Sequence, residues 1–188
     1  MGKIILASSS PRRAEILKSK YDIEIMPSPY EEIHSTTAFS YSYVENLAYN
    51  KVKAVIPLVK EDVFIVGADT VVVLDGKILE KPKNSDEAKL MLKELSGKTH
   101  QVVTSIALAN AKSGKIVVNS TTSNVTFNYL TSEMINYYVD NFKPFDKAGA
   151  YGIQELPDGF VNKYSGSLEN IIGICPKALE DLFKKFTT

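Results

Sequence analysis

The chain has 188 residues, of which 44% are hydrophobic and 23% charged, so it is long and apolar enough to form a domain with a buried core. Basic and acidic residues balance at 22 each, and Asp69 interrupts the longest apolar run (residues 63–74), which argues against nucleic-acid binding and against a membrane span. The only cysteine, Cys175, excludes an internal disulfide and favours a reducing compartment such as the cytoplasm.

The N-terminal segment predicts a strand that leads directly into a helix. Residues 3–7 form a short apolar run, and three serines at positions 8–10 interrupt it. Pro11 suits the first position of a helix, with Ser10 as the N-cap. Such a connection points free backbone N–H groups and the positive end of the helix dipole toward one place.

Two arginines at the start of this helix make the place in front of it a predicted anion site. Arg12 and Arg13 carry guanidinium groups, which can hold phosphate oxygens in a fork. The segment alone also fits an ordinary capped helix with two surface arginines, so both interpretations stay open at this point.

A short strand and a long polar loop follow. Apolar and acidic residues alternate at positions 22–25, which predicts a half-buried second strand. The loop of residues 26–42 carries two adjacent carboxylates, Glu31 and Glu32. Carboxylates in a loop are usually solvated, so these two matter for function only if the loop folds over the anion site.

Helical spacing of apolar residues predicts the next helix at about residues 42–56. Lys51 lies on its apolar stripe, three and four residues after Ala48 and Leu47. A lysine in that place costs desolvation energy unless it reaches solvent or has an anionic partner. The pattern leaves both solutions open.

An acid lies in the middle of the most apolar segment of the chain. The run at residues 63–74, the Asp75-Gly76 dipeptide and residues 77–80 together predict a β-hairpin. Because an isolated buried carboxylate is costly, we expect Asp69 to face a cation, a metal or a network of donors, although an aspartate that caps a turn is the alternative. Gly67 permits another backbone or a ligand to approach closely.

The second half of the chain alternates helices and strands. The expected elements are a helix capped by Ser85, strands at residues 100–111 and 115–129, a helix starting at Thr131, a hairpin centred on residues 157–159 and a last helix from Pro176. The sequence therefore predicts an α/β fold, with a twisted mixed sheet flanked by helices. We expect one domain over residues 1–188, with an active-site cleft between two lobes as a variant of that arrangement.

Taken together, these features predict a nucleoside-triphosphate site. Basic groups neutralise phosphates, and buried acids hold a divalent metal or orient a water molecule. The candidate residues are Arg12, Arg13, Lys51, Asp69 and Lys81. There is no Walker A sequence, and the spacing of Gly149 and Gly152 does not match a dinucleotide-binding fingerprint.

Five motifs give the chain a resemblance to a known family. They are Leu6-Ala-Ser-Ser-Ser-Pro-Arg-Arg13, Gly67-Ala-Asp-Thr70, Glu80-Lys-Pro82, Ser96-Gly-Lys-Thr-His100 with Thr104, and Asp146-Lys-Ala-Gly-Ala-Tyr-Gly-Ile-Gln154. In this order, over essentially the whole chain, they resemble the Maf family of nucleotide pyrophosphatases. The resemblance implies hydrolysis of a nucleoside triphosphate to the monophosphate and pyrophosphate with a divalent cation, Mg²⁺ or Mn²⁺. It also implies the fold shared with the inosine-triphosphate pyrophosphatases.

The resemblance assigns roles to residues by their position in these motifs. Asp69 resembles the catalytic acid, which accepts a proton, and Glu32 resembles a loop carboxylate that binds the metal together with Asp69. Glu31 adjoins Glu32, so the choice between these two carboxylates stays open. The residues that correspond to the phosphate site are Ser8, Arg12, Arg13, Lys51 and Lys81.

Three further positions bear on which base is accepted. The branch that resembles dTTP/UTP pyrophosphatases carries Arg, Thr and Gln at positions that correspond to Arg12, Thr70 and Gln154. The Gln154 amide offers both a donor and an acceptor, which suits the imide edge of thymine or uracil. We therefore expect dTTP and UTP, and modified pyrimidine nucleotides, as substrates.

Two other functions remain alternatives. A 7-methyl-GTP-type pyrophosphatase of the same family departs at these three positions. A nucleotide-binding regulator of cell division or septum formation would not need an acid in its core at Asp69. From the resemblance we further expect a house-cleaning role in the cytoplasm and a homodimer, with no nucleic-acid or membrane partner.

Overall fold

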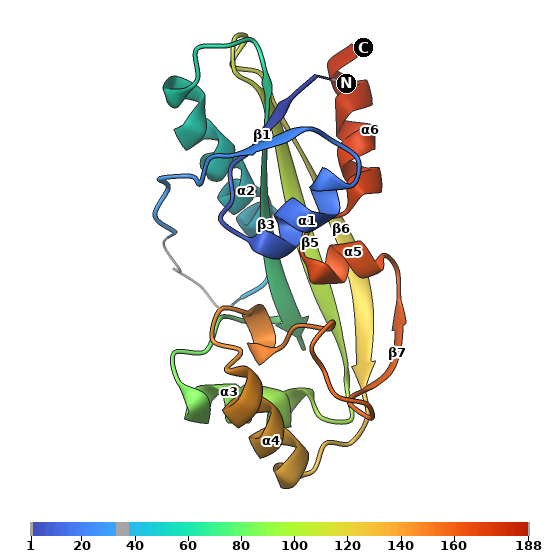
Figure 1. Ribbon diagram of the computed structural model, residues 1–188. Coiled ribbons are helices and arrows are strands. Elements are labelled where there is room, and N and C mark those ends of the chain that lie inside the picture. The colour runs from blue at the N-terminus through green and yellow to red at the C-terminus, as the bar shows by residue number, and fades with distance from the viewer. Residues whose placement is uncertain (1, 33–37, 188) are drawn as a thin grey trace.

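The computed structural model, which describes residues 2–32 and 38–187, contains one mixed sheet with helices on both faces (Figure 1). The loop predicted at residues 26–42 contains residues 33–37, which lie outside the described residues. The strands are β1 (Ile4–Leu6), β2 (Ile23–Ile25), β3 (Phe64–Leu74), β4 (Lys77–Leu79), β5 (Thr99–Asn110), β6 (Ile116–Phe127) and β7 (Val161–Ser165). Their order is β2-β1-β3-β5-β6-β7, with β4 paired to β3. Strand β1 pairs in parallel with β2 and β3, and the other pairs are antiparallel, which confirms the predicted α/β class with a mixed sheet.

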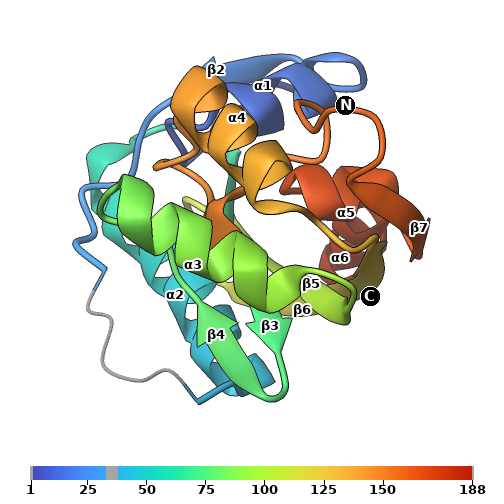
Figure 2. The same cartoon turned by 90° about the horizontal axis from the view of Figure 1, so that it is seen from below.

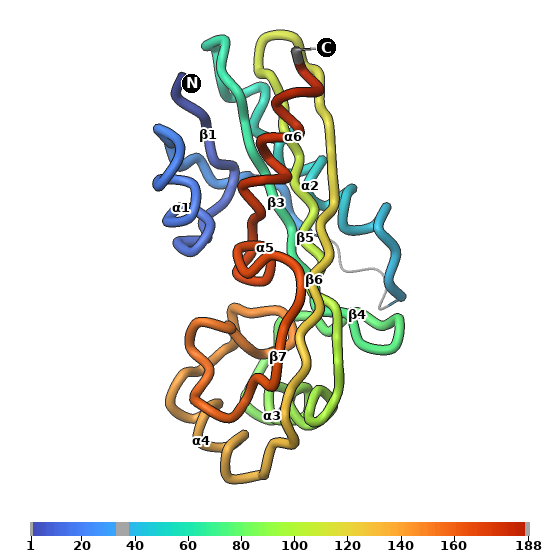
Figure 3. The backbone as a smooth tube through the Cα atoms, turned by 90° about the vertical axis from the view of Figure 1, so that its right-hand side faces the viewer, coloured from blue at the N-terminus to red at the C-terminus, as the bar shows by residue number. Residues whose placement is uncertain are grey.

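Helices cover the sheet unequally. They are α1 (Pro11–Lys18), α2 (Tyr41–Val55), α3 (Ser85–Leu95), α4 (Ser132–Phe142), α5 (Leu168–Ile172) and α6 (Pro176–Thr187), with short 3₁₀ turns η1 (Ile56–Leu58) and η2 (Ala148–Ala150). Helix α2 packs on one face, and α1 and α6 pack on the other (Figure 3). Helices α3 and α4 lie together at the end of the molecule opposite the two chain termini (Figure 1), and Figure 2 looks onto this end. Within the described ranges, no helix combines the length and the hydropathy needed to cross a membrane.

Local sequence signals account for most element ends. The Ser10 hydroxyl accepts a hydrogen bond from the backbone N–H of Arg13, so Ser10 is the N-cap of α1 as predicted. Asp75 and Gly76 both have positive φ angles, of 50° and 75°, and join β3 to β4 in the predicted hairpin.

Three predictions of local structure were wrong or incomplete. The cap of α3 is Asn84 and not Ser85, because the Asn84 side chain accepts from the Glu87 N–H at 2.9 Å and its backbone is extended. Residues 157–159 form a turn but no hairpin, since the strand that follows them, β7, pairs with β6. The five-residue helix α5 was not predicted.

The face of the sheet that carries α1 and α6 is apolar at both ends and polar in the middle. One cluster lies under α1 and α6 and includes Leu6, Val66, Ile106 and Leu179, and the other lies under α3 and α4 and includes Val72, Val102, Phe127 and Tyr138. Between them, the hydroxyls of Thr70 and Thr104 lie 2.9 Å apart on neighbouring strands. This polar strip marks where the two apolar clusters separate. The expected single domain over residues 1–188, with two lobes as its variant, stays a prediction.

His100 packs against the second cluster. His100 is 2% exposed, its Nε2 lies 2.7 Å from the hydroxyl of Tyr151, and its ring meets Phe127 edge to face. Burial lowers the pKa of His100 from its usual 6.5 to about 4, because the imidazolium would lose its hydration.

This burial predicts a specific pH dependence of stability. Between pH 6.5 and pH 4 the unfolded chain binds a proton at His100 and the folded chain does not, so the free energy of unfolding falls as the pH falls through this window. We expect a loss of about 2 kcal/mol at pH 5 relative to pH 7.5 from this residue. Urea unfolding of wild type and His100→Gln at both pH values measures it: the variant should lack this part of the acid sensitivity. Equal acid sensitivity in the two proteins would contradict the assignment.

Candidate active site

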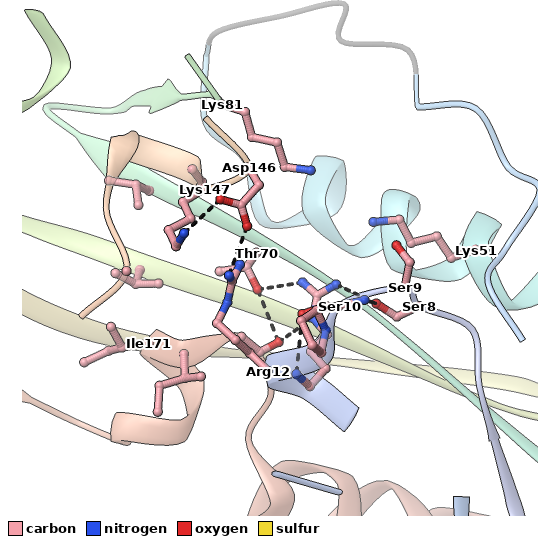
Figure 4. Close-up of a pocket in the computed structure, with 18 of the residues that line it drawn as sticks. Ser8, Ser9, Ser10, Arg12, Lys51, Thr70, Lys81, Asp146, Lys147 and Ile171 are labelled. Carbon is pink, nitrogen blue, oxygen red and sulfur yellow. Dashed lines mark hydrogen bonds and ion pairs between the residues drawn. The ribbon is translucent and has the colours of Figure 1, made fainter. Parts of the chain in front are cut away.

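A pocket of about 430 Å³ opens beside the polar strip, where the end of β1, the start of α1 and the loop before β7 meet (Figure 4). Eight of the nine residues predicted for the site line this pocket: Ser8, Arg12, Arg13, Glu32, Lys51, Thr70, Lys81 and Gln154. Residues from six separate stretches of the chain thus come together. The exception, Asp69, lies beside the pocket in contact with Lys51.

The pocket lies along a stretch of β3 that has one strand neighbour instead of two. Strand β1 pairs with β3 at residues 64–66, and β4 pairs with it at residues 72–74. Between these pairings, on that edge, no strand of the described residues pairs with residues 67–71. Side chains from both faces of β3 can therefore reach the opening, although they alternate between the two faces.

Gly67 explains how α2 comes close enough to contribute a lysine. A Cβ at this position would lie 2.8 Å from Cγ1 of Val52 and 3.3 Å from the carbonyl oxygen of Ala48, so only glycine fits without displacing the helix. The predicted close approach at Gly67 is confirmed, and the approaching group is the backbone of α2. The next residue on the same face of β3 is Asp69, which faces Lys51.

Lys51 is held between two carboxylates. Its Nζ donates to Oδ1 of Asp69 at 2.6 Å and lies 2.6 Å from Oε1 of Glu32. The carbonyl oxygen of Ala68 accepts from the same nitrogen at 3.4 Å, which gives each of the three ammonium protons an acceptor. Of the two solutions left open for this lysine, the anionic partner is confirmed, and the partner of Asp69 is a cation.

Lys51 and its two carboxylate partners are largely removed from solvent. The side chains of Lys51, Asp69 and Glu32 are 11%, 10% and 24% exposed. Asp69 does not line the pocket itself, and its contact with the pocket runs through Lys51, which does. Asp69 therefore lies next to the pocket, beside Lys51, and is 7% exposed as a whole residue.

Arg13 is enclosed by neutral acceptors. Its Nε donates to the carbonyl oxygen of Gly173 at 2.8 Å, Nη1 to the hydroxyl of Ser8 at 3.3 Å and Nη2 to the hydroxyl of Thr70 at 3.0 Å. Burial lowers the pKa of Arg13. Arg13 thus ties the loop after β1 to β3 and to the turn before α6, and it presents only its remaining N–H groups to the pocket.

The Thr70 hydroxyl is already engaged. It accepts from Arg13 and also lies within hydrogen-bonding distance of the Thr104 hydroxyl and of the Gly173 carbonyl oxygen, at 2.9 and 3.3 Å. With three such neighbours, Thr70 is placed to fix the position of Arg13 and not to read a base by itself.

Two charged residues of the pocket were missed by the sequence predictions. Asp146 accepts from Nη1 of Arg12 at 3.1 Å and from Nζ of Lys147 at 2.8 Å, and both acid and lysine line the pocket. Burial of Asp146 favours its neutral form, but hydrogen bonds from Lys147 and Arg12 outweigh this effect and lower the pKa of the carboxyl. The glycine-rich composition of residues 146–154 was the available signal, and it did not identify these two side chains.

Lys81 and Gln154 complete the lining. Lys81 follows β4 and extends toward the pocket (Figure 4), and Gln154 is an exposed residue of the turn at 153–155. The loop around Gln154 is joined to the segment that holds Lys81, since the N–H of Gly149 donates to the carbonyl oxygen of Glu80 at 3.2 Å.

Comparison with known proteins gives a consistent result. A family model described as Maf-like protein matches residues 3–186. A dTTP/UTP pyrophosphatase from Clostridium novyi (strain NT) is 43% identical over 188 residues, which cover 98% of this chain and 96% of that protein. A dTTP/UTP pyrophosphatase from Escherichia coli O157:H7 is 41% identical over 175 residues, which cover 93% of this chain and 88% of that protein.

A solved structure of a nucleoside-triphosphatase / dITP/XTP pyrophosphatase from Mycobacterium abscessus covers 97% of this chain and 93% of its own chain. It aligns with a TM-score of 0.47 and 16% sequence identity.

The contacts of Lys51 predict the stability of two variants. Lys51→Met leaves the carboxylates of Glu32 and Asp69 close together without their cation, so we expect the free energy of unfolding to fall by about 3 kcal/mol. The double variant Lys51→Met/Asp69→Asn removes one of these charges and should recover at least half of the loss. Urea unfolding at pH 7 measures both, and a single variant as stable as wild type would show that the contacts contribute nothing.

Proposed function

The chain belongs to the Maf-like protein family, and from this membership and the contents of the pocket we propose that it hydrolyses dTTP and UTP to the nucleoside monophosphate and pyrophosphate. The observation that carries the proposal is the convergence of four cationic side chains, Arg12, Arg13, Lys51 and Lys81, on one pocket with a buried acid beside it. Relatives of 41–43% identity, named dTTP/UTP pyrophosphatases, support this choice of substrates.

The triphosphate is bound at the N-terminal end of α1. Ser10, Pro11 and Arg12 line the pocket at the positive end of the helix dipole, where anions are favoured. Ser8 supports this loop, because its hydroxyl accepts from the N–H of Ser10 at 3.2 Å as well as from Arg13. Lys81 reaches the pocket from the side of β4 and neutralises the outer phosphates.

Glu32 and Asp69 fit a divalent cation, Mg²⁺ or Mn²⁺. Their oxygens Oε1 and Oδ1 already hold one cationic group, the Lys51 ammonium, at 2.6 Å each, so a divalent cation would share these two carboxylates with Lys51. Magnesium is commonly held by one or two carboxylates together with substrate phosphates and water. Among the described residues, no three or more His, Cys, Asp or Glu side chains form a possible metal site, so the substrate would provide the other ligands. When bound, the cation would neutralise phosphate charge.

The chemistry is an attack of water on the α-phosphorus. The water oxygen forms a bond to the α-phosphorus, the bond to the oxygen that bridges the α- and β-phosphorus breaks, and pyrophosphate leaves with that oxygen. Asp69 accepts the proton of the water; its Oδ1 is held by Lys51, which leaves Oδ2 for this role. Arg12, Lys51 and Lys81 stabilise the negative charge that develops on the departing pyrophosphate.

Gln154 reads the base. It lies on an exposed turn at the edge of the pocket, and its amide can donate to one group and accept from another on the imide edge of thymine or uracil. In cytosine N3 is an acceptor and the 4-amino group is a donor, so both relations at N3 and C4 are reversed. Thr70 contributes through Arg13, whose Nη2 it accepts from, and not by contact with the base.

The proposal includes the expected compartment, cellular role and partners of the enzyme. The single cysteine, Cys175, favours a cytoplasmic enzyme. Removal of modified pyrimidine nucleotides, a homodimer and the absence of a nucleic-acid partner stay predictions.

We expect Asp69→Asn to lower kcat for dTTP by about 100-fold or more, because asparagine cannot accept the proton and loses the charge that faces Lys51. Release of pyrophosphate in the presence of Mg²⁺ measures the rate. Asp62→Asn, which changes an exposed aspartate paired with Lys112, is the matched control and should retain wild-type turnover. Near-normal turnover by Asp69→Asn would remove Asp69 from the chemistry.

A substrate panel tests the identity of the base. With Mg²⁺ or Mn²⁺, kcat/KM for dTTP and UTP should exceed that for CTP and 7-methyl-GTP by at least about tenfold, because a site built to hydrogen-bond one base rejects another that leaves polar groups unpaired. The products should be the monophosphate and pyrophosphate. Preference for 7-methyl-GTP would contradict the choice of base, and tight nucleotide binding without metal-dependent hydrolysis would favour the regulator.

A further inference from the structure

Four side chains of alternating charge connect the two ends of the predicted base-reading region. Arg12 contacts Oδ2 of Asp146 at 3.1 Å, and Lys147 contacts Oδ1 of the same carboxylate at 2.8 Å. The Nζ of Lys147 also lies 3.0 Å from Oε2 of Glu155. The series therefore begins at Arg12 and ends next to Gln154, and these are two of the three positions that bear on the choice of base.

Lys147 is the buried member of this series. Its side chain is 8% exposed, whereas those of Asp146 and Glu155 are 60% and 38% exposed. A lysine loses much hydration in such a place and is stable there only with anionic partners. Because two carboxylates hold it, the position of the Lys147 ammonium is fixed while each acid keeps contact with water.

The stem of Lys147 also shapes the backbone next to Gln154. A Cβ on Gly152 would lie 2.9 Å from Cε and 3.0 Å from Cδ of Lys147, so the chain at Gly152 packs directly on the lysine. The N–H of Glu155 donates to the carbonyl oxygen of Gly152 at 3.0 Å and closes a turn with Gln154 inside it. Lys147 thus holds both ends of this turn, Gly152 by packing and Glu155 by charge.

A second support comes from α4. The hydroxyl of the buried Tyr138 accepts from the N–H of Gly152 at 3.2 Å, which fixes the entry to the turn from the side of the core. The exit from the turn is fixed by the ion pair between Glu155 and Lys147. Loss of Tyr138 contact would loosen one end, while loss of Lys147 would loosen both.

We propose that Lys147 is a positioning residue for base selection: it sets the Gln154 turn through Glu155 and Gly152, and the orientation of Arg12 through Asp146. This inference rests on the proposed function, because it assigns Gln154 the reading of the base. Lys147 acts through other side chains and takes no part in the transfer of the phosphoryl group. Its removal should therefore reduce discrimination between bases more than it reduces turnover.

The test compares Lys147→Met with wild type on dTTP and CTP in the presence of Mg²⁺. The ratio of kcat/KM for dTTP to that for CTP should fall by about tenfold, mainly through a higher KM for dTTP, while kcat for dTTP falls by less than about threefold. Lys147→Arg keeps the charge and should recover part of the ratio. Lys89→Met, which breaks the Lys89–Asp140 contact of 3.1 Å away from the pocket, is the control for loss of a partly buried lysine in an ion pair and should leave the ratio unchanged.

A second variant covers the case in which Lys147→Met does not fold. Glu155→Gln keeps the size of the side chain and removes the charge that meets Lys147, so the ratio should fall by about threefold. An unchanged ratio in the folded variants, or an equal loss of kcat on both nucleotides, would overturn the inference. Normal hydrolysis of dTTP by wild type would in that case still support the proposed function. Absence of dTTP hydrolysis by wild type would overturn both.

Discussion

The contact on which the site depends is the ammonium group of Lys51 between Glu32 and Asp69, at 2.6 Å from each. Two carboxylates so close together and so little exposed would repel each other and lose hydration if no cation lay between them. The Lys51 ammonium compensates both negative charges, and its third proton is donated to the carbonyl oxygen of Ala68. Lys51 can reach this position because Gly67 lets α2 pack directly against β3. Lys51 thereby holds Asp69 by its Oδ1 beside the pocket, where the proposed mechanism places the base.

The second constraint is the unpaired edge of β3. Strand β1 is only three residues long, and β4 begins to pair six residues beyond the end of the β1 pairing, at Val72. Asp69 and Thr70 lie in this interval on opposite faces of the sheet, and yet each is coupled to a cation that lines the same pocket, Lys51 and Arg13 respectively. A fully paired sheet would separate these two groups. The opening also explains why the apolar surface of the sheet divides into two clusters with the Thr70–Thr104 strip between them.

Much of this arrangement could be predicted from the sequence, for reasons that differ between elements. Ser10 and Pro11 specify the start of α1 by local hydrogen bonding and a fixed φ, and Asp75-Gly76 specifies a hairpin by its positive φ angles. Helical periodicity placed Lys51 on a buried face but could not identify its partners, because they lie 18 and 19 residues away in separate elements. Asp146 was missed for the same reason, since one of its two partners is Arg12, 134 residues away. The placement of Asp69 beside Lys51 likewise follows from packing, which the local sequence does not show.

The most direct test of the account is a crystal structure of the chain with Mg²⁺ and a dTTP analogue that carries an imido group between the α- and β-phosphorus. The account predicts that the triphosphate lies along residues 8–13 toward Lys81 and that its α-phosphate lies beside Lys51 and Asp69. It also predicts that the thymine faces Gln154. A nucleotide bound elsewhere, or bound in this pocket with its α-phosphate away from Asp69, would contradict the account.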